Sequence, residues 1–294
     1  MTRIALVTAQ VSRSLDDDLV PLQKALENQG AEVLMPAWDD ANFDWRSVDL
    51  ALLRSTWDYT LRLPEFLAWI DTAATQTRLF NPPPVVRWNT DKHYLRDLGR
   101  AGVAVVPSAF IEPGEAAADK LDAFLAEPTD CTEFVVKPCV GAGSRDAQRY
   151  THEERAAALT HAQRLLDAGR SVLLQPYLDR VDEHGETALI FFAGEFSLAI
   201  RKGPLLRRGE GPTRALFAAE HIMPRQPGID ELSLARATLA AMPFGALLYA
   251  RVDVIQAADG TPRLLELELT EPSLFFDHAA DSAQRFASAV LSRA

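Results

Sequence analysis

A short C-terminal stretch carries three carboxylates and an arginine at alternating positions, and it reads ARVDVIQAADGTPRLLELELTEPS. Its central pair, Asp259-Gly260, separates two runs of alternating residues and predicts a β-hairpin with a type I′ turn. A symmetric loop at this pair places Asp253 opposite Glu266 and Arg251 opposite Glu268. Because opposite residues share a face, all four side chains should meet on one side of the sheet.

The apolar residues of this stretch fall on the other face, because side chains along a strand alternate with a period of two. The residues predicted to face the core are Val252, Val254, Leu265, Leu267 and Leu269. Three carboxylates on the opposite face repel one another unless a cation lies between them. Oxygen ligands suit magnesium or manganese, which complete their coordination with water and substrate phosphates. The hairpin therefore predicts a metal–nucleotide site, although a solvated face with an ordinary Arg251–Glu268 ion pair fits the same pattern.

Upstream segments contain groups that could bind phosphate. Lys137 falls in the apolar strand EFVVKP, where an unpaired ammonium is costly, so its side chain should reach a cleft or an anion, or extend to solvent. The loop that follows is a glycine-bearing hairpin tip that can direct backbone amides at phosphate oxygens, although it lacks the GK[ST] of a P-loop. Its residues are Gly141, Ala142, Gly143 and Ser144.

Lys92 lies in NTDKHYLRDLGRAG, which predicts a helix that begins near Asn89 or Thr90 and ends at Gly102. A lysine in the first turn is unfavourable next to the positive end of the helix dipole, unless an anion such as phosphate binds between them. An exposed lysine without a ligand is the simpler alternative.

The proline-broken segment QPYL, residues 175–178, follows a buried strand and could present backbone donors and acceptors to a flat base. Asp182, Glu183 and Glu186 come shortly afterwards, and one of them could hold ribose hydroxyls. The next stretch, TALIFFAGEFSLAIRK, predicts a hairpin around Ala193-Gly194.

That hairpin delivers Arg201 and Lys202 to a basic, glycine-rich loop, residues 202–214. The loop could clamp phosphate, or it could simply be solvated. Solvation is the better interpretation for Arg207 and Arg208.

The elements that must position these groups begin with a parallel unit. Strands are predicted in RIALVTA, AEVLMPA and VDLALLRS, with a helix from about Asp16 to Gly30 and another in PEFLAWIDTAATQ. The carboxyl ends of parallel strands form a binding crevice, which here exposes TAQVSR and RSTWDY. The alternative is that the polar residues of RSTWDY only cap the sheet edge.

The segment NPPPVVRWN, residues 81–89, predicts a rigid extended connector, because consecutive prolines disfavour helix. We expect three units on this basis: residues 1–84, a substrate domain; residues 85–179, a lid that carries both lysines and the glycine-bearing loop; and residues 180–294, with the metal site.

Composition excludes several function classes. The chain has 294 residues, a net charge of −11 and a pI near 5.1, so nucleic acid and anionic membranes are not the expected partners. Its two cysteines do not form a CxxC pair, and no apolar run resembles a signal peptide or membrane span. We expect a cytoplasmic protein with a small-molecule ligand. The oligomeric state is left open, a homodimer included.

The order of these parts resembles the ATP-grasp superfamily across nearly the whole chain: Lys92, the VVKP strand with Lys137, the GAGS loop, the LLQPYL hinge, the basic strand end and the acidic hairpin. The resemblance implies an α/β fold with α+β lobes: an N-terminal Rossmann-like βαβ domain, a small central lid and a C-terminal antiparallel sheet that binds metal. It also implies ATP and magnesium as cofactors, with manganese as a substitute.

The same resemblance implies a role for each matching residue. Lys92 and Lys137 would contact the phosphates of ATP, residues 141–144 would cover them, and Gln175, Pro176, Tyr177 and Leu178 would frame adenine. Asp182, Glu183 or Glu186 would hold ribose. Asp253, Glu266 and Glu268 would ligate magnesium, and Arg251 with Lys202 or Arg201 would neutralise the γ-phosphate. Many members end the metal strand with E-x-N, whereas this chain has Glu266 and Glu268, so the second ligand is anionic.

Such ligases phosphorylate a carboxylate and let a nitrogen nucleophile capture the acyl phosphate. TAQVSR, RSTWDY and LELTEPSLF are most similar to the glutathione-synthetase-like branch that includes cyclo-ligases acting on O-ureido-D-serine. This similarity implies an amino-acid substrate that closes a ring on itself. The substrate contacts it implies are Gln10, Arg54, Thr56, Asp58, Tyr59, Thr270 and Ser273. Alternatives are an intermolecular carboxylate–amine ligase, a small-molecule kinase and a nucleotide-binding regulator.

Overall fold

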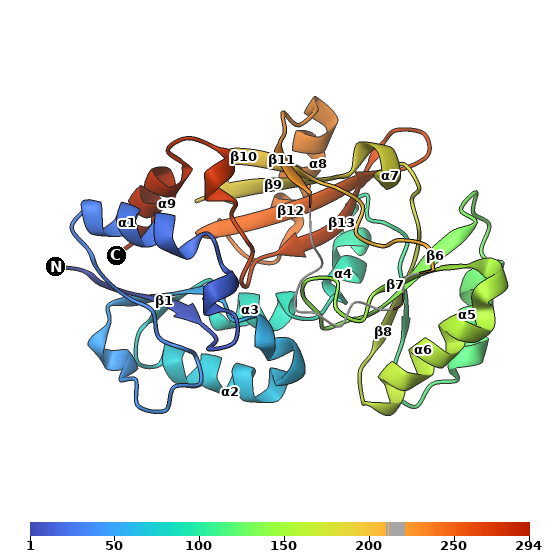
Figure 1. Cartoon of the computed structure of the whole chain (residues 1–294), viewed down its shortest axis with the longest axis horizontal. Helices are drawn as coiled ribbons and strands as arrows, with labels where there is room; N and C mark the ends of the chain where they lie inside the picture. Colours follow the sequence, from blue (N-terminus) through green and yellow to red (C-terminus); the bar gives the residue numbers. More distant parts are fainter. Residues whose placement is uncertain (210, 212–220) are drawn as a thin grey trace.

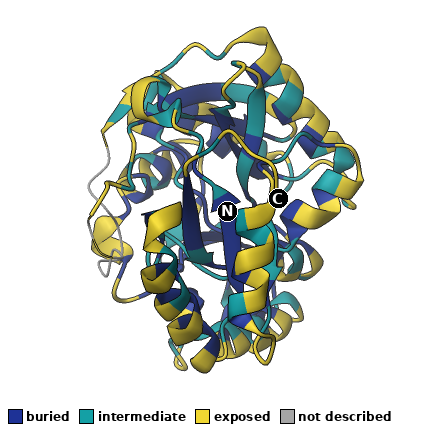
Figure 2. Ribbon diagram, turned by 90° about the vertical axis from the view of Figure 1, so that its right-hand side faces the viewer, coloured by how far each residue is buried: buried dark blue, intermediate teal, exposed yellow. Residues whose placement is uncertain are grey.

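The computed structural model describes residues 1–209, 211 and 221–294. In these residues three β-sheets surround a common centre (Figure 1), and each sheet falls within one of the three predicted ranges. Buried strands occupy the interior, and the helices around them turn their exposed residues outward (Figure 2). This arrangement leaves the ends of several strands facing one another.

The N-terminal sheet is parallel, in the order β2-β1-β3-β4. Its strands are β1 (Arg3–Thr8), β2 (Glu32–Leu34), β3 (Leu50–Ser55) and β4 (Arg78–Phe80). Helix α1 (Leu19–Asn28) turns Leu19, Leu22 and Leu26 to the core, and α2 (Leu63–Ala74) follows β3. The predicted strands and helices of this unit are therefore confirmed.

The central sheet is antiparallel, in the order β5-β8-β6-β7. Its strands are β5 (Ala109–Ile111), β6 (Glu133–Pro138), β7 (Gln148–Thr151) and β8 (Val172–Pro176), with helices α5 (Ala117–Ala126) and α6 (Arg155–Asp167) packed on it. This unit has a hydrophobic core of its own, which includes Phe134, Leu165 and Leu174.

The C-terminal sheet is also antiparallel, in the order β11-β10-β9-β12-β13. Its strands are β9 (Glu186–Phe192), β10 (Glu195–Lys202), β11 (Ile222–Pro224), β12 (Tyr249–Gln256) and β13 (Pro262–Glu268). Helices α7 (Val181–His184), α8 (Ile229–Ala241) and α9 (Ser282–Leu291) accompany it. The predicted hairpin at Ala193-Gly194 is confirmed, with φ of 52° and 90° at these two residues.

The expected extended connector is wrong, because Pro83–Asn89 forms helix α3. Its prolines occupy the first turn, where backbone amides have no partner within the helix and proline costs little. The expected helix start at Asn89 or Thr90 is also wrong. Helix α3 ends at Asn89, and the next helix, α4 (Tyr94–Arg100), begins five residues later. Both helices pack on the C-terminal sheet, where Val85 and Leu95 share a core with Leu267.

The hairpin of β12 and β13 has the predicted central pairs, Asp253 with Glu266 and Arg251 with Glu268. Its turn differs from the prediction. Gly260 has a φ of 81°, Asp259 does not adopt a positive φ, and the Ala257 amide donates to the Thr261 carbonyl at 2.9 Å.

The three-residue loop that results shifts the pairing near the turn by one residue, so that Val254 pairs with Leu264. An irregularity between Asp253 and Val254 then restores the predicted register. Leu264 takes the core position expected for Leu265, which lines the central cavity instead.

Candidate functional site

A cavity of about 520 Å³ lies where the three sheets meet. Strands β6 and β8 of the central sheet contribute Lys137 and Gln175, and strands β10, β12 and β13 contribute Lys202, Asp253 and Glu266. The predicted site residues that line it are Tyr59, Lys92, Lys137, Gly141, Ala142, Gly143, Ser144, Gln175, Pro176, Tyr177, Leu178, Glu186, Lys202, Arg251, Asp253, Glu266, Glu268 and Ser273. The fold therefore brings together residues that lie more than 200 positions apart in the sequence.

A buried charge network occupies the face predicted from the hairpin. The Nε of Arg251 donates to Asp253 Oδ1 at 2.9 Å, and the Nζ of Lys202 donates to Asp253 Oδ2 at 2.8 Å. Arg251 also contacts Glu268, and Lys202 contacts Glu186. Burial alone would raise the pKa of Asp253, but the charges of Arg251 and Lys202 hold it well below its usual range. Asp253 is therefore a permanent anion between two cations.

Glu266 lies on the same face and pairs with Lys92, whose Nζ is 2.8 Å from Glu266 Oε1 and 3.0 Å from the Gly141 carbonyl oxygen. Burial would lower the pKa of Lys92, but the Glu266 charge raises it above the usual value. Lys92 precedes α4, and its amide donates to the Cys139 carbonyl at 2.9 Å. Through these contacts it joins the glycine-bearing loop to the acidic hairpin.

Lys137 lines the cavity from near the end of β6, next to Lys92 and Glu266. Burial lowers its pKa, the charge of Glu266 opposes this effect, and the neighbouring charge of Lys92 adds to it. The structure shows no hydrogen bond or ion pair from its amine to any described residue. The amine therefore has hydrogen-bond donors left for an anion, as expected for a lysine that binds phosphate.

Glu266 and Glu268 have the oxygen atoms that a hard cation requires. One oxygen of each is bonded to Lys92 or Arg251, and the second forms no hydrogen bond or ion pair with a described side chain. Burial raises the pKa of Glu268 to about 7, against the opposing charge of Arg251. These residues fit a magnesium ion. Both oxygens of Asp253 are already bonded to Arg251 and Lys202, so it fits the metal less well than predicted.

The predicted base-binding segment forms one wall of the cavity, beside the apolar side chains of Val135, Ile255 and Leu265. Asp182 and Glu183 do not line the cavity. Asp182 instead pairs with Arg149 at 3.2 Å and accepts a hydrogen bond from the Tyr177 hydroxyl. Glu186, four residues after Asp182 at the start of β9, does line it, and burial raises its pKa to about 8.

Arg201 does not lie with the other predicted cations. It neighbours Lys202 in β10, and consecutive residues of a strand face opposite sides. Its Nε donates to the His184 carbonyl at 2.6 Å and its Nη2 to the Glu183 carbonyl at 2.8 Å. In the basic loop, Arg208 pairs with Glu133 at 2.7 Å, while residues 210 and 212–214 lie outside the described part of the chain.

Five of the predicted substrate contacts do not line the cavity: Gln10, Arg54, Thr56, Asp58 and Thr270. Gln10 is exposed. Arg54 is fully buried and its Nη2 donates to the Pro272 carbonyl at 2.9 Å. Asp58 accepts a hydrogen bond from Trp38 Nε1 at 2.8 Å, and Thr270 donates to Asn89 Oδ1 at 3.4 Å. Among described residues, the Thr56 hydroxyl is buried without a partner.

Sequence reasoning missed Glu271, Asp16 and His278, all of which line the cavity, as does Trp57 of the predicted segment RSTWDY. The period-two pattern of β13 predicts Thr270 on the cavity side, but the strand ends at Glu268 and the chain then changes direction. Glu271 takes the predicted place of Thr270. The sequence signal that could have identified Glu271 was its position, as an acidic residue directly after the alternating run.

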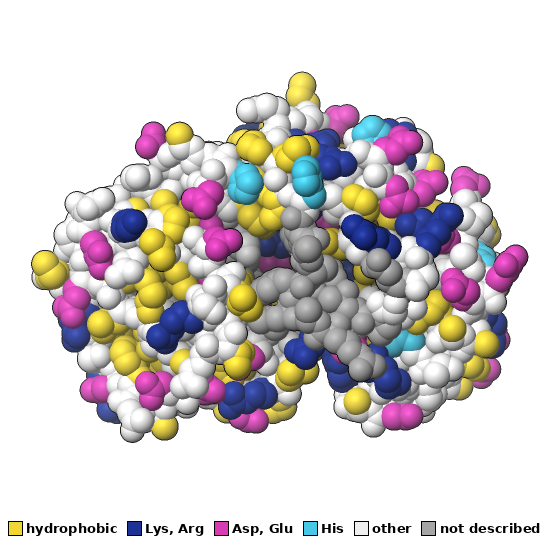
Figure 3. All heavy atoms as spheres, in the orientation of Figure 1, with side chains coloured by type: hydrophobic (Ala, Val, Ile, Leu, Met, Phe, Trp, Pro, Cys, Tyr) yellow, Lys and Arg dark blue, Asp and Glu magenta, His cyan; other side chains and the backbone are white. Residues whose placement is uncertain are grey.

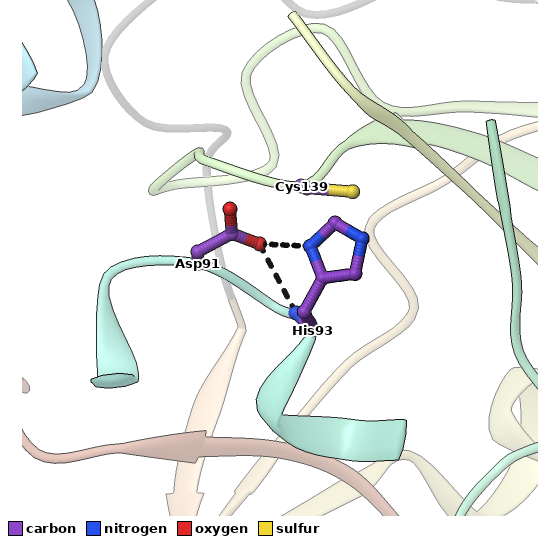
Figure 4. Close-up of side chains that lie close together, drawn as sticks. All are labelled: Asp91, His93 and Cys139. Atoms are coloured by element: carbon purple, nitrogen blue, oxygen red, sulfur yellow. Dashed lines mark hydrogen bonds and ion pairs between the residues drawn. The ribbon is translucent and has the colours of Figure 1, made fainter. Parts of the chain in front are cut away.

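Asp91, His93 and Cys139 form a second group of polar side chains (Figure 4), with potential metal-ligand atoms within 4.8 Å of one another. His93 Nδ1 is 2.6 Å from Asp91 Oδ1, and Nε2 is 2.7 Å from Glu112 Oε1. Burial raises the pKa of the Cys139 thiol. A metal would need a free ring nitrogen and a thiolate. We interpret the group as a hydrogen-bonded bridge from the start of α4 to β5.

The surface agrees with the composition. On the described part of the face in Figure 3, basic and acidic side chains are interspersed. Helices in the described ranges are all too short or too polar to cross a lipid bilayer.

Comparison with known proteins places the chain among characterised families. Residues 4–81 match the N-terminal domain of D-cycloserine synthetase DcsG. The chain is 40% identical to the cycloserine biosynthesis protein DcsG of Streptomyces lavendulae over 295 residues, 99% of this chain and 98% of that protein. The crystal structure of D-cycloserine synthetase DcsG superposes with a TM-score of 0.91 at 40% identity and 99% coverage of both chains.

More distant structures share the fold. D-alanine–D-alanine ligase from Bacillus anthracis has a TM-score of 0.71 at 15% identity, covering 99% of this chain and 97% of that chain. The ATP-grasp ligase PsnB, complexed with its minimal precursor, has a TM-score of 0.66 at 18% identity, covering 100% and 99%. Other structures of these two proteins contain ATP, and magnesium with ADP, respectively.

Proposed function

The chain belongs to the DcsG family of ATP-grasp ligases, and from this premise we propose that it uses ATP and magnesium to activate the carboxylate of a small amino acid and close a ring on it. The proposed substrate is O-ureido-D-serine, because the 40% identity to a cycloserine biosynthesis protein extends over 99% of the chain. The predicted superfamily, fold class and carbon–nitrogen ligase activity are confirmed by these comparisons.

One observation carries the proposal: the cavity combines a cationic floor with a pair of carboxylates that have free oxygens. Lys92 and Lys137 would bind the phosphates of ATP, and the loop of residues 141–144 would cover them. Residues 175–178 would hold the base, and Glu186 the ribose. Glu266 and Glu268 would ligate magnesium, which supplies charge neutralisation for the transferred phosphoryl group.

Arg251 and Lys202 would stabilise the charge that develops as the γ-phosphoryl group passes to the substrate carboxylate. Asp253 holds both cations in place through its two oxygens, and it becomes available to the metal only when one of those contacts opens. The nitrogen nucleophile then attacks the acyl phosphate carbon, a C–N bond forms, and phosphate leaves. We propose a cytoplasmic enzyme that also accepts manganese.

The test is ADP release in the presence of ATP, magnesium and O-ureido-D-serine, with product identified by mass spectrometry. Glu266→Gln should lower kcat/KM by about 100-fold or more, because a neutral ligand binds the metal more weakly. Glu65→Gln, which changes an exposed partner of Arg62, should match the parent.

A requirement for a second amino acid would instead show an intermolecular ligase, and a stable phosphorylated product without free phosphate would show a kinase. Full activity of Glu266→Gln would remove this residue from the metal site.

A further inference from the structure

Glu271 is a buried carboxylate that forms no ion pair with any residue the structure describes. It is 7% exposed, lines the cavity, and follows the end of β13 by three residues. Among described residues, no lysine, arginine or histidine forms an ion pair with it. Two other carboxylates that line the cavity have such a partner: Asp253 has Arg251 and Lys202, and Glu266 has Lys92. A buried anion without a counter-ion is costly unless a ligand supplies the missing charge.

Neighbouring groups hold this carboxylate in place. The Tyr59 hydroxyl neighbours the Glu271 side chain, and Trp57 Nε1 donates to the Glu271 carbonyl oxygen at 3.2 Å. Arg54 donates to the next carbonyl, that of Pro272, at 2.9 Å. The end of β3 and the segment after it thus anchor residues 271 and 272 from the N-terminal unit. A side chain fixed in this way is preorganised for a ligand.

The charges of the cavity divide it into two parts. Lys92, Lys137, Lys202 and Arg251 line the part between the central and C-terminal sheets, which suits a triphosphate. Asp16 and Glu271 line the part next to the N-terminal unit, and Asp16 Oδ2 is buried without a partner among described residues. A phosphate near Glu271 would be repelled. The ligand of this second part must carry a positive charge or hydrogen-bond donors.

We propose that Glu271, oriented by Tyr59, binds the primary ammonium group of the amino-acid substrate. This inference rests on the proposed function, because it assigns a binding residue for the substrate of that same site. Burial raises the pKa of Glu271 to about 8, with the charge of Glu268 adding to the shift. An ammonium at hydrogen-bond distance would restore the ionised carboxylate. The same contact would orient the substrate so that its carboxylate points to the γ-phosphate.

The test compares ligands that differ only in the amine. Calorimetry in the presence of magnesium and a non-hydrolysable ATP analogue needs no turnover. The first pair of probes is O-ureido-D-serine and its desamino counterpart, 3-(ureidooxy)propanoate. The second pair is D-serine and 3-hydroxypropanoate. The parent protein should prefer the amine-bearing member of a pair by about 10- to 100-fold, the range for a charged hydrogen bond in a buried site.

Glu271→Gln keeps the volume and a polar side chain next to Tyr59 but removes the charge. It should reduce the preference to less than about threefold and leave the affinity for the ATP analogue within about threefold. Tyr59→Phe should retain most of the preference, because the charge remains. A Glu271→Gln protein that keeps the parental preference, or loses affinity for both members equally, would overturn the inference.

If Glu271→Gln does not fold, measurements on the parent protein alone still test the role of Glu271. Equal affinity for both members of a pair in the parent would overturn the inference without any variant. Failure of the proposed function gives a different result. In that case O-ureido-D-serine would produce no ADP, while the preference for D-serine over 3-hydroxypropanoate, and its loss in Glu271→Gln, would still support the role of Glu271.

Discussion

Asp253 is the shared anion of two cations that line the cavity, Arg251 and Lys202. Its side chain is 1% exposed, and those of its partners Arg251 and Lys202 are 8% and 7% exposed. A buried ion pair gains little over an apolar pair, but the loss of one member leaves an uncompensated buried charge. In this protein the cations serve the proposed phosphoryl transfer, so the carboxylate that holds them cannot be replaced cheaply.

Asp253→Asn should therefore lower the free energy of unfolding by about 3–5 kcal/mol, because two buried cations lose their shared anion. Urea denaturation followed by circular dichroism measures this change. Asp71→Asn is the matched control, because Asp71 pairs with Arg87 where both side chains are about half exposed, and it should change stability by less than about 1 kcal/mol. Equal losses of unfolding free energy in the two variants would mean that Glu186 and Glu268 balance the charges of Lys202 and Arg251 without Asp253.

At the scale of elements, the junction of α7 and β9 depends on a glycine. Gly185 has a φ of 73°, and an added Cβ would overlap the Lys202 carbonyl oxygen and lie 2.8 Å from Arg201 Nε. Only a residue without a side chain allows β10 to approach this closely. The approach places Lys202 beside Glu186 in the cavity.

Gly185→Ala should destabilise the protein by clearly more than Gly169→Ala. Gly169 also has a φ of 73°, but no atom lies within 4 Å of the position that an added Cβ would take, so its replacement should cost only the backbone term of about 1 kcal/mol. The difference between the two unfolding free energies measures the contact with Lys202. Gly185→Ala should also raise the KM for ATP. Equal losses would show that β10 moves away without cost.

The central unit contains an element with a marked pH dependence. His161 of α6 is 6% exposed, and its Nδ1 lies 3.0 Å from the Tyr150 hydroxyl of β7. Burial lowers its pKa to about 4, from 6.5 in the unfolded chain. Between these values the unfolded state binds a proton that the folded state does not. The contribution of neutral His161 to the free energy of unfolding is therefore complete above pH 6.5 and is lost as the pH falls toward 4.

His161→Gln removes this titration and keeps a hydrogen-bonding side chain. The drop in unfolding free energy between about pH 7 and about pH 4.5 should be smaller in this variant than in the parent, by up to about 3 kcal/mol. Urea titrations at several pH values measure it. His152→Gln, at an exposed histidine just before α6, controls for the loss of an imidazole. Parallel curves for parent and His161→Gln would contradict the prediction.

For the whole molecule, the cores show which units belong together. One hydrophobic cluster contains Ile4 and Leu52 of the N-terminal sheet, Ile190 of the C-terminal sheet and Phe286 of α9. The Tyr249 hydroxyl adds a polar link, since it is 3.0 Å from the Phe80 carbonyl and 2.9 Å from the Thr270 carbonyl. We infer that the N- and C-terminal units unfold together, whereas the central unit has its own core.

Tyr249→Phe should lower the free energy of unfolding by about 1–3 kcal/mol, because buried carbonyls lose their donor. Four of the five tryptophans, Trp38, Trp45, Trp57 and Trp69, lie in residues 1–84, so tryptophan fluorescence reports mainly on the N-terminal unit. Although Tyr249 belongs to β12, the fluorescence transition should shift to lower urea. An unchanged fluorescence midpoint, with a shift seen only by circular dichroism, would show that the two units unfold independently.

The local sequence pattern was sufficient to predict much of the structure of this protein. The period-two alternation around residues 251–268 determined that Asp253, Glu266, Arg251 and Glu268 share a face, because side-chain direction in a strand depends only on position along it. The order of motifs determined the superfamily, and the strands and helices of the N-terminal unit followed from hydrophobic periodicity. The roles assigned to individual residues remain predictions.

Tertiary structure decided what depends on contacts between distant segments. Whether Thr270 or Glu271 faces the cavity depends on where β13 ends, and whether Asp182 or Glu186 reaches it depends on Arg149, 33 residues before Asp182. The helix at Pro83–Asn89 likewise depends on packing against the C-terminal sheet, where Val85 shares a core with Leu267. A sequence pattern records local geometry, but the free energy that selects between two locally acceptable conformations comes from burial and pairing across the whole chain.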